Sequence, residues 1–120
     1  MFEYQSIIHR YIILELTLKC LEVDRSKIED FKTYYAFSEW FEVKNKEVYR
    51  EFLDIQNQFK KNKIRYISTH KDGPSITVYQ FYVAGKELAL RYNNIALRNW
   101  TNEEVKRLLM LPYRAQNEIR

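Results

Sequence analysis

A run of regularly spaced apolar residues in the middle of the chain constrains the fold more than any other feature. Four of them recur at helical spacing: Val48, Phe52, Ile55 and Phe59. At 100° per residue they fall within an arc of about 60°. Asn45 is a suitable N-cap, because its side-chain oxygen can accept a hydrogen bond from a free backbone N–H of the first turn. The pattern predicts an amphipathic helix over about 46–61, with its apolar stripe buried against the rest of the chain.

Two β-strands are predicted directly after this helix. Residues 63–68 have strand character, and residues 76–83 are rich in β-branched and aromatic side chains, which is typical of strands. The turn-forming residues 70–75 join them into an antiparallel hairpin with a loop of about six residues. Helices packed on a small antiparallel hairpin or sheet make an α+β fold, and 120 residues suffice for a single domain with one core.

The remaining segments are helical or ambiguous. Residues 7–23 show both a period of two and a helical stripe, and their length without Gly or Pro favours a helix. Residues 26–29 (SKIE) fit a capping box, which predicts a helix over about 27–37. Residues 86–98 fit either a third strand or a helix, of which the helix is favoured. Residues 101–104 (TNEE) form a second capping box that predicts the start of a short final helix.

Positive charge is concentrated in the second half of the chain. Residues 1–60 carry nine Lys and Arg against eleven Asp and Glu, whereas residues 61–120 carry eleven against five. Within 44–71, eight basic residues accompany three acidic ones. On the predicted helix over 46–61 the cations and amides share one side, whereas a merely solvated face would more often interleave its charges as i,i+4 pairs. The pattern indicates a surface for an anionic partner.

No motif of catalysis, metal binding or cofactor binding stands out. His9 and His70 lack further ligands at metal-binding spacing, and Gly73 and Gly85 are the only glycines, so no glycine-rich phosphate loop exists. Cys20 is the only cysteine, which favours a reducing compartment. The N-terminus lacks the features of a signal peptide, and no apolar run is long enough to span a membrane. We expect a non-enzymatic cytoplasmic protein without cofactor, metal or membrane contact.

The predicted order of two helices and a β-hairpin over 26–81 resembles a winged helix-turn-helix domain. The matching pieces are Glu47-Val48-Tyr49-Arg50 in the predicted recognition helix, Lys63-Ile64 at the first wing strand and Val78-Tyr79-Gln80-Phe81 in the second. In such domains the recognition helix lies in the major groove of double-stranded DNA, and the wing touches the backbone or minor groove. The resemblance implies a recognition helix over about 46–61 and a wing over about 64–83. Asn62 or Lys63 stands where a glycine usually precedes the wing.

The charge pattern and the resemblance together predict a DNA-binding regulator of transcription or replication. Lys and Arg neutralise phosphates, while Arg, Asn and Gln read base edges. The expected DNA-binding residues are Lys46, Tyr49, Arg50, Gln56, Asn57, Lys60, Lys61, Lys63, Arg65 and Lys71. Arg50 is expected to point at base edges. If DNA is not the partner, Arg50 is expected merely to pair with Asp54 at i+4.

A protein-interaction module is the alternative class of function. Such modules include inhibitors, immunity-like and antitoxin-like proteins, and host-takeover proteins of phages. If residues 11–22 and 87–92 form strands, a four-stranded α+β sandwich results, with Tyr66, Tyr79 and Tyr82 on a face suited to a protein partner. A helix over residues 11–22 favours DNA binding instead.

The composition also predicts a homodimer. Apolar residues make up 46% of the chain and 19 residues are aromatic, so an exposed apolar patch is expected. The expected dimer contacts are Ile8, Ile12 and Leu16, or else Tyr34 and Trp40.

Overall fold

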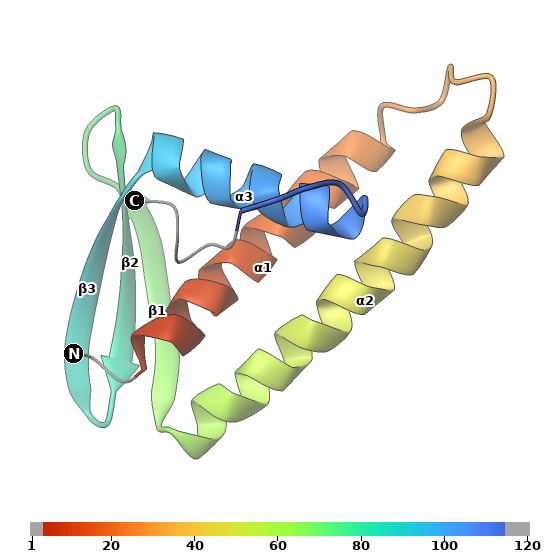
Figure 1. Ribbon diagram of the computed structural model, residues 1–120. Coiled ribbons are helices and arrows are strands. Elements are labelled where there is room, and N and C mark those ends of the chain that lie inside the picture. The colour runs from red at the N-terminus through yellow and green to blue at the C-terminus, as the bar shows by residue number, and fades with distance from the viewer. Residues whose placement is uncertain (1–3, 115–120) are drawn as a thin grey trace.

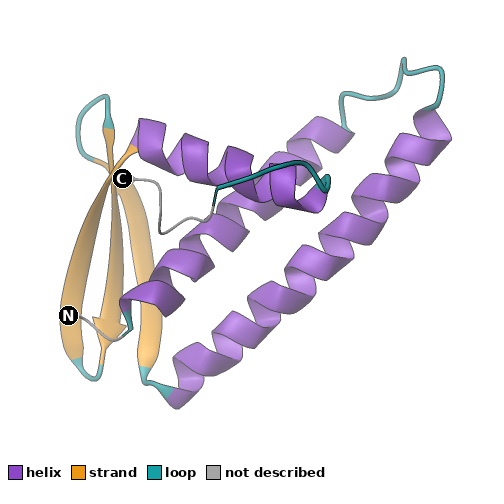
Figure 2. Ribbon diagram, in the orientation of Figure 1, coloured by secondary structure: helices purple, strands orange, loops and turns teal. Residues whose placement is uncertain are grey.

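The computed structural model describes residues 4–114, which form three helices and one antiparallel sheet (Figures 1 and 2). In chain order the elements are α1 (Gln5–Arg25), α2 (Tyr34–Lys61), β1 (Ile64–Lys71), β2 (Ile76–Val83), β3 (Lys86–Asn93) and α3 (Asn94–Leu108). The sheet is a meander in which β2 lies between β1 and β3. The predicted α+β class is therefore confirmed.

α1 is the central helix of the fold. It packs against both α2 and α3, and its first half lies against one face of the sheet, called here the inner face (Figure 1). The second half of α1 and the first half of α2 run antiparallel beyond the sheet as a two-helix hairpin. The molecule is consequently elongated, with extents of 51 × 33 × 25 Å.

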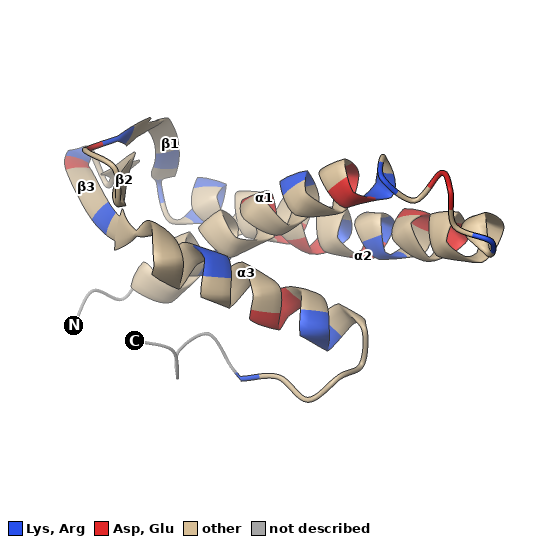
Figure 3. Cartoon of the chain, turned by 90° about the horizontal axis from the view of Figure 1, so that it is seen from above, with Lys and Arg blue, Asp and Glu red and all other residues tan. Residues whose placement is uncertain are grey.

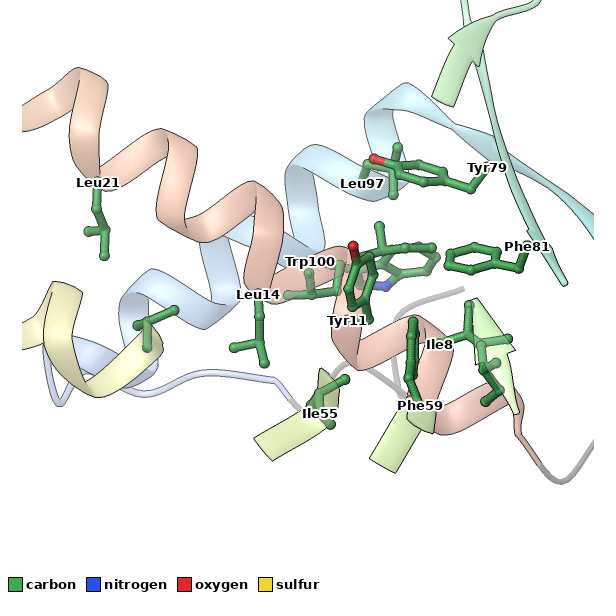
Figure 4. Close-up of a cluster of buried hydrophobic side chains, with 14 of the residues drawn as sticks. Ile8, Tyr11, Leu14, Leu21, Ile55, Phe59, Tyr79, Phe81, Leu97 and Trp100 are labelled. Carbon is green, nitrogen blue, oxygen red and sulfur yellow. The ribbon is translucent and has the colours of Figure 1, made fainter. Parts of the chain in front are cut away.

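Tyr11 of α1 lies at the centre of the core (Figure 4). Its ring stacks on Phe59 of α2 with a centroid distance of 4.6 Å, and it meets Phe81 of β2 edge-on at 6.0 Å. Because α2, α3 and the sheet all cover this part of α1, apolar residues nearly surround the helix. The helix predicted over residues 7–23 is confirmed. Because apolar residues lie nearly all around it, its sequence also shows the period of two that is typical of a strand.

The first predicted capping box does not start a helix. Ser26 instead ends α1, and its hydroxyl donates a hydrogen bond of 2.5 Å to the carbonyl oxygen of Val23. Such a local bond competes with N-capping. Residues 26–33 form the connection between two antiparallel helices, so the helix predicted over 27–37 begins only at Tyr34.

α2 is one continuous helix where the sequence pattern predicts two. Asn45, the predicted N-cap, lies inside it, and residues 38–45, between the two predicted helices, are helical. The segment contains no Gly or Pro, and Phe41 stands seven residues before Val48, so the apolar stripe continues through the connection. The helix predicted over 46–61 is thus the second half of α2.

The antiparallel hairpin predicted over 64–83 is confirmed, with a shorter loop. β1 extends to Lys71, which pairs with Thr77 of β2. The loop therefore comprises residues 72–75 rather than 70–75.

Residues 86–93 form a third strand rather than the favoured helix. In β3, Leu88 pairs with Phe81 and Leu90 pairs with Tyr79. Because side chains alternate between the two faces of a strand, both leucines lie on the inner face and pack against the core. The local sequence supports a strand and a helix almost equally, and pairing with the free edge of β2 favours the strand.

α3 begins at Asn94 and not at the second predicted capping box. The side chain of Asn93 caps the helix by accepting a hydrogen bond of 2.8 Å from the backbone N–H of Ile95. Residues 101–104 lie in the middle of the helix, and Glu104 is buried.

A network of four charged side chains joins the three helices. Arg10 of α1 donates hydrogen bonds of 2.7 and 2.9 Å to the two carboxylate oxygens of Glu104 in α3, and one of 2.7 Å to Glu51 in α2. Arg107 of α3 donates a further bond of 2.6 Å to Glu104, whose side chain is only 2% exposed. Burial raises the pKa of Glu104, but the bonds from both arginines outweigh it, so the pKa lies below its usual value. Glu104 is therefore a buried carboxylate anion that connects α1 to α3.

Replacing Glu104 by Gln should destabilise the fold by about 3 kcal/mol, because Arg10 then keeps only one anionic partner in a partly buried place. Urea denaturation at pH 7, followed by circular dichroism, measures the change. Glu47→Gln is the matched control, since its exposed pair with Lys44 at 3.3 Å contributes less than about 1 kcal/mol. Equal losses in the two variants would contradict the assigned role of the network.

The same carboxylate should make the fold sensitive to acid. Because the folded pKa of Glu104 lies below its ordinary value of 4.5, the stabilisation is complete above that value and is lost as the pH falls through the folded pKa. In urea titrations between about pH 7 and 3, the wild type should lose more unfolding free energy than Glu104→Gln does. If the unfolding free energy of the two proteins fell equally with decreasing pH, this carboxylate would be excluded as a cause of acid sensitivity.

Candidate nucleic-acid interface

A basic surface lies where α2 ends and the sheet begins. The backbone N–H of Lys63 donates to the carbonyl oxygen of Lys60, and the N–H of Ala84, in the turn between β2 and β3, donates to the carbonyl oxygen of Lys63 at 3.0 Å. These bonds bring together the end of α2, the start of β1 and the β2–β3 turn. Five exposed cations lie around this meeting point, called here the basic junction: Lys60, Lys61, Lys63 and, on opposite faces of the sheet, Arg65 and Lys86.

The charges of the basic junction face solvent. Among residues 4–114, no acidic side chain forms an ion pair with any of its five cations. The guanidinium of Arg65 lies over the Tyr82 ring at 4.7 Å from its centroid, and the Tyr82 hydroxyl donates to Glu87 at 3.1 Å. The junction can therefore present several positive charges to an anion.

The backbone of the junction is strained at two residues that are not glycine. Lys63 has a φ of 56° and Ala84 a φ of 52°, in the left-handed region where a side chain costs about 1 kcal/mol. Lys63 follows the C-cap of α2, a position that glycine usually fills. The lysine therefore carries a conformational cost at this position, as does Met110, with a φ of 62°, after the C-cap of α3.

The outward face of α2 carries the other predicted contacts of the recognition helix. Lys46, Tyr49, Arg50 and Asn57 are exposed on it, and Gln56 is half-buried at its margin. Figure 3 shows blue Lys and Arg positions along α2 and on β1. The predicted sorting of the helix faces is therefore present, with the apolar stripe inside and these polar side chains outside.

The acidic flank of α2 is partly neutralised within the protein. Glu51 accepts from Arg10, and Glu47 lies 3.3 Å from the ammonium of Lys44. Arg50 forms no ion pair with any described residue, and so not with Asp54, the partner expected for it without DNA. Lys46, in contrast, lies 3.4 Å from Glu42 on the turn before it. Arg50, like Lys60 and Lys61 further along α2, therefore has no ion-pair partner among residues 4–114.

Lys71 does not join the other predicted contacts. It ends β1, about 23 Å from the start of that strand at 3.3 Å per residue, beside the loop over 72–75. There Arg91 of β3 forms a short ion pair with Asp72. In addition, β3 pairs along the whole of β2, so the hairpin predicted as a wing is part of a three-stranded sheet.

The tyrosine-lined face predicted for a protein partner does not form. Tyr66 and Tyr79 lie on the inner face and pack against the core, whereas Tyr82 lies on the opposite face beside Arg65. The four-stranded sandwich behind that prediction is also wrong, because residues 11–22 are helical.

The first set of predicted dimer contacts is largely buried inside one chain. Ile8 and Ile12 are completely inaccessible, and Leu16 is half-buried. The first two therefore cannot contact a second copy. Their apolar character serves the intramolecular core around α1.

Sequence reasoning does not single out Lys86. It comes near Lys63 because β1 pairs with β2, Ile64 opposite Val83, which brings the β2–β3 turn and Lys86 after it to the end of α2. No local pattern in the sequence carries this information.

Within residues 4–114, no three or more His, Cys, Asp or Glu side chains gather as they would around a metal ion. None of the helices in that range combines the length and apolar character needed to cross a membrane.

A family model described as YhjD protein matches residues 2–112. The chain belongs to the YhjD family. No curated protein and no solved structure matched the chain. The YhjD match spans every described helix and strand, so the basic junction and the two-helix hairpin both lie within it.

Proposed function

We propose that this protein binds double-stranded DNA through the basic junction and the outward face of α2, as a regulator of transcription or replication. The observation that carries the proposal is Lys63. It is an exposed cation at a backbone position that favours glycine, among four further exposed cations. The lysine adds a positive charge to this surface at a position where glycine would cost less conformational energy.

The size and charge of the surface fit a segment of duplex. From Lys46 to Lys61, the face of α2 extends about 22 Å at 1.5 Å per residue, which corresponds to about six base pairs at 3.4 Å each. Each cation that neutralises a phosphate releases counterions from the DNA. Because Glu47 and Glu51 are engaged with cations inside the protein, they reduce the positive potential of this face less than free carboxylates would.

In this proposal, Arg50 and Asn57 are the residues that contact the bases. They stand seven residues apart on the outward face of α2, so their side chains emerge from the same side of the helix two turns apart. Arg can make two hydrogen bonds to guanine and Asn two to adenine in the major groove. The helical state of α1 also agrees with the DNA-binding alternative and not with the sheet-based interaction module.

The double variant Lys60→Ala/Lys63→Gly should weaken binding to a 20-base-pair duplex at least tenfold at low salt, and lower the slope of log K against log salt by about 2. Fluorescence anisotropy at several NaCl concentrations measures both. Relief of the left-handed strain at Lys63 should raise stability by about 0.5–1 kcal/mol, so unfolding would not explain weaker binding.

Lys27→Ala/Lys32→Ala, which removes equal charge from the far end of the two-helix hairpin, is the matched control. Absence of wild-type binding, or equal losses in both variants, would refute the proposal.

Arg50→Ala should lower affinity for a preferred duplex, selected from a random library, by roughly ten- to a hundredfold, because a bidentate base contact contributes about 1–3 kcal/mol. Its affinity for unrelated duplex should fall much less. The unfolding free energy should hardly change, since Arg50 is exposed and forms no ion pair with residues 4–114. Indistinguishable binding curves for wild type and variant would exclude Arg50 as a base-reading residue.

A further inference from the structure

The outer edge of β3 is an open strand edge. β3 pairs with β2 on one side, and within residues 4–114 no strand pairs with it on the other. Figure 1 shows β3 at the margin of the sheet, with α3 leading from its end toward α1 and so away from this edge. The unpaired backbone N–H and C=O groups along such an edge form a template for another strand.

The opposite edge of the sheet is less suited to pairing, because β1 is irregular. Its register with β2 shifts between Tyr66 and Ser68, as in a β-bulge, and bulges protect an edge from other chains. β3, in contrast, pairs with β2 in one unbroken register over all eight of its residues. The outer edge of β3 is therefore regular over the same length.

The hydrogen bond at the end of β3 shows which residues direct their backbone to the open edge. The N–H of Asn94 donates to the carbonyl oxygen of Ser75 at 2.9 Å, so the backbone of residue 94 points toward the β2 side. In an antiparallel pair this direction alternates from one residue to the next. The even-numbered residues of β3 therefore bond to β2. The odd-numbered ones point their N–H and C=O groups to the open edge, among them Glu87, Ala89 and Arg91.

The sequence of this edge is complementary to itself in the antiparallel direction. Residues 87–91 read Glu-Leu-Ala-Leu-Arg, with the same apolar order from either end and opposite charges at the two ends. If two copies of β3 pair antiparallel about Ala89, Glu87 of each copy lies opposite Arg91 of the other. This register also sets the free backbone groups of the two odd-numbered series against each other, so they can bond.

The same register matches the inner faces of the two sheets. Leu88 of each copy would lie opposite Leu90 of the other. Both leucines are half-buried and pack against the core of their own chain. Pairing would therefore continue the apolar layer from one sheet into the next.

The charged pairs of this register would lie on the outer face. Glu87 accepts a hydrogen bond from Tyr82 but forms no ion pair among residues 4–114. Arg91 pairs with Asp72, and its guanidinium has further N–H donors for a second carboxylate. Opposite charges across two strands stabilise a sheet, whereas like charges destabilise it. The neighbouring registers that also match the backbone, about residue 88 or 90, leave these charges unpaired.

We propose that two copies of this chain form a homodimer by antiparallel pairing of their β3 strands about Ala89, so that the two three-stranded sheets become one of six strands. Residues 87–91 would contribute about six backbone hydrogen bonds between the copies. Tyr34 and Trp40, the alternative contacts expected from the composition, lie in the first half of α2 and take no part. The proposal is independent of DNA binding.

Light scattering after size exclusion, at roughly 10–200 µM protein to cover micromolar affinities, tests the dimer without DNA. The wild type should approach twice the chain mass of 14.8 kDa as the concentration rises. Glu87→Arg and Arg91→Glu each set like charges opposite each other and should weaken the dimer by about tenfold or more. The combined variant Glu87→Arg/Arg91→Glu restores opposite charges and should restore the dimer. Glu22→Arg, at an exposed acid in the second half of α1, is the matched control and should remain dimeric.

Ala89→Pro tests the backbone pairing in place of the charges. The proline removes an N–H that points to the open edge and none that bonds to β2, and edge strands accept proline in this orientation. The dimer should be lost, while the circular dichroism spectrum stays as in the wild type.

A monomeric wild type at the highest concentration would overturn the proposal. A dimer that survives Ala89→Pro and both single charge reversals would overturn it as well. So would single reversals that disrupt the dimer without rescue by the combined variant, since the rescue requires the register about Ala89. Each of these outcomes stands whether or not the protein binds DNA.

Discussion

The bidentate contact between Arg10 and Glu104 determines how the three helices lie against one another. Taking these charges out of water is costly, and the cost is offset only when several hydrogen bonds form in good geometry. Glu51 and Arg107 complete that geometry, so the network joins α1, α2 and α3 through hydrogen-bonded ion pairs. Tyr11 follows Arg10 by 100° around α1, so an adjacent side of the same helical turn enters the aromatic core over the sheet.

This packing determines which charged side chains of α2 face the rest of the protein and which face solvent. With the apolar stripe turned toward α1, the acidic flank lies beside cations of the protein, where Glu51 meets Arg10. The cations on the remaining side face solvent, and the basic junction continues them onto β1 and the β2–β3 turn. The surface proposed to bind DNA thus follows from the way α2 is packed, and Lys63 adds charge to it at the expense of backbone strain.

The two ends of the molecule expose different kinds of side chain because their elements are packed differently. At one end the sheet and three helices cover each other, and mainly charged side chains reach the surface. At the other end two helices have only each other to pack against, and aromatic side chains remain exposed.

Local periodicity in the sequence is sufficient to predict the second half of α2, the helical state of α1, the β1–β2 hairpin and the α+β class. Those predictions succeed because a helical stripe or a run of β-branched and aromatic residues depends on neighbours only a few positions away. The outward position of Arg50 and Asn57 follows from the same stripe. Whether these residues bind DNA is a question that periodicity does not answer.

Only the tertiary structure decided the remaining features. Ser26 and its neighbours resemble a helix start, yet the hydroxyl bonds back to Val23 because the chain has to reverse there. Residues 86–93 become a strand because β2 has an open edge beside them. The partners Arg10 and Glu104 are separated by 94 positions, and the β2–β3 turn comes to Lys63 only because β1 pairs with β2. Contacts between segments distant in sequence leave no periodic signal, since they are set by packing and by the satisfaction of buried polar groups once the elements assemble.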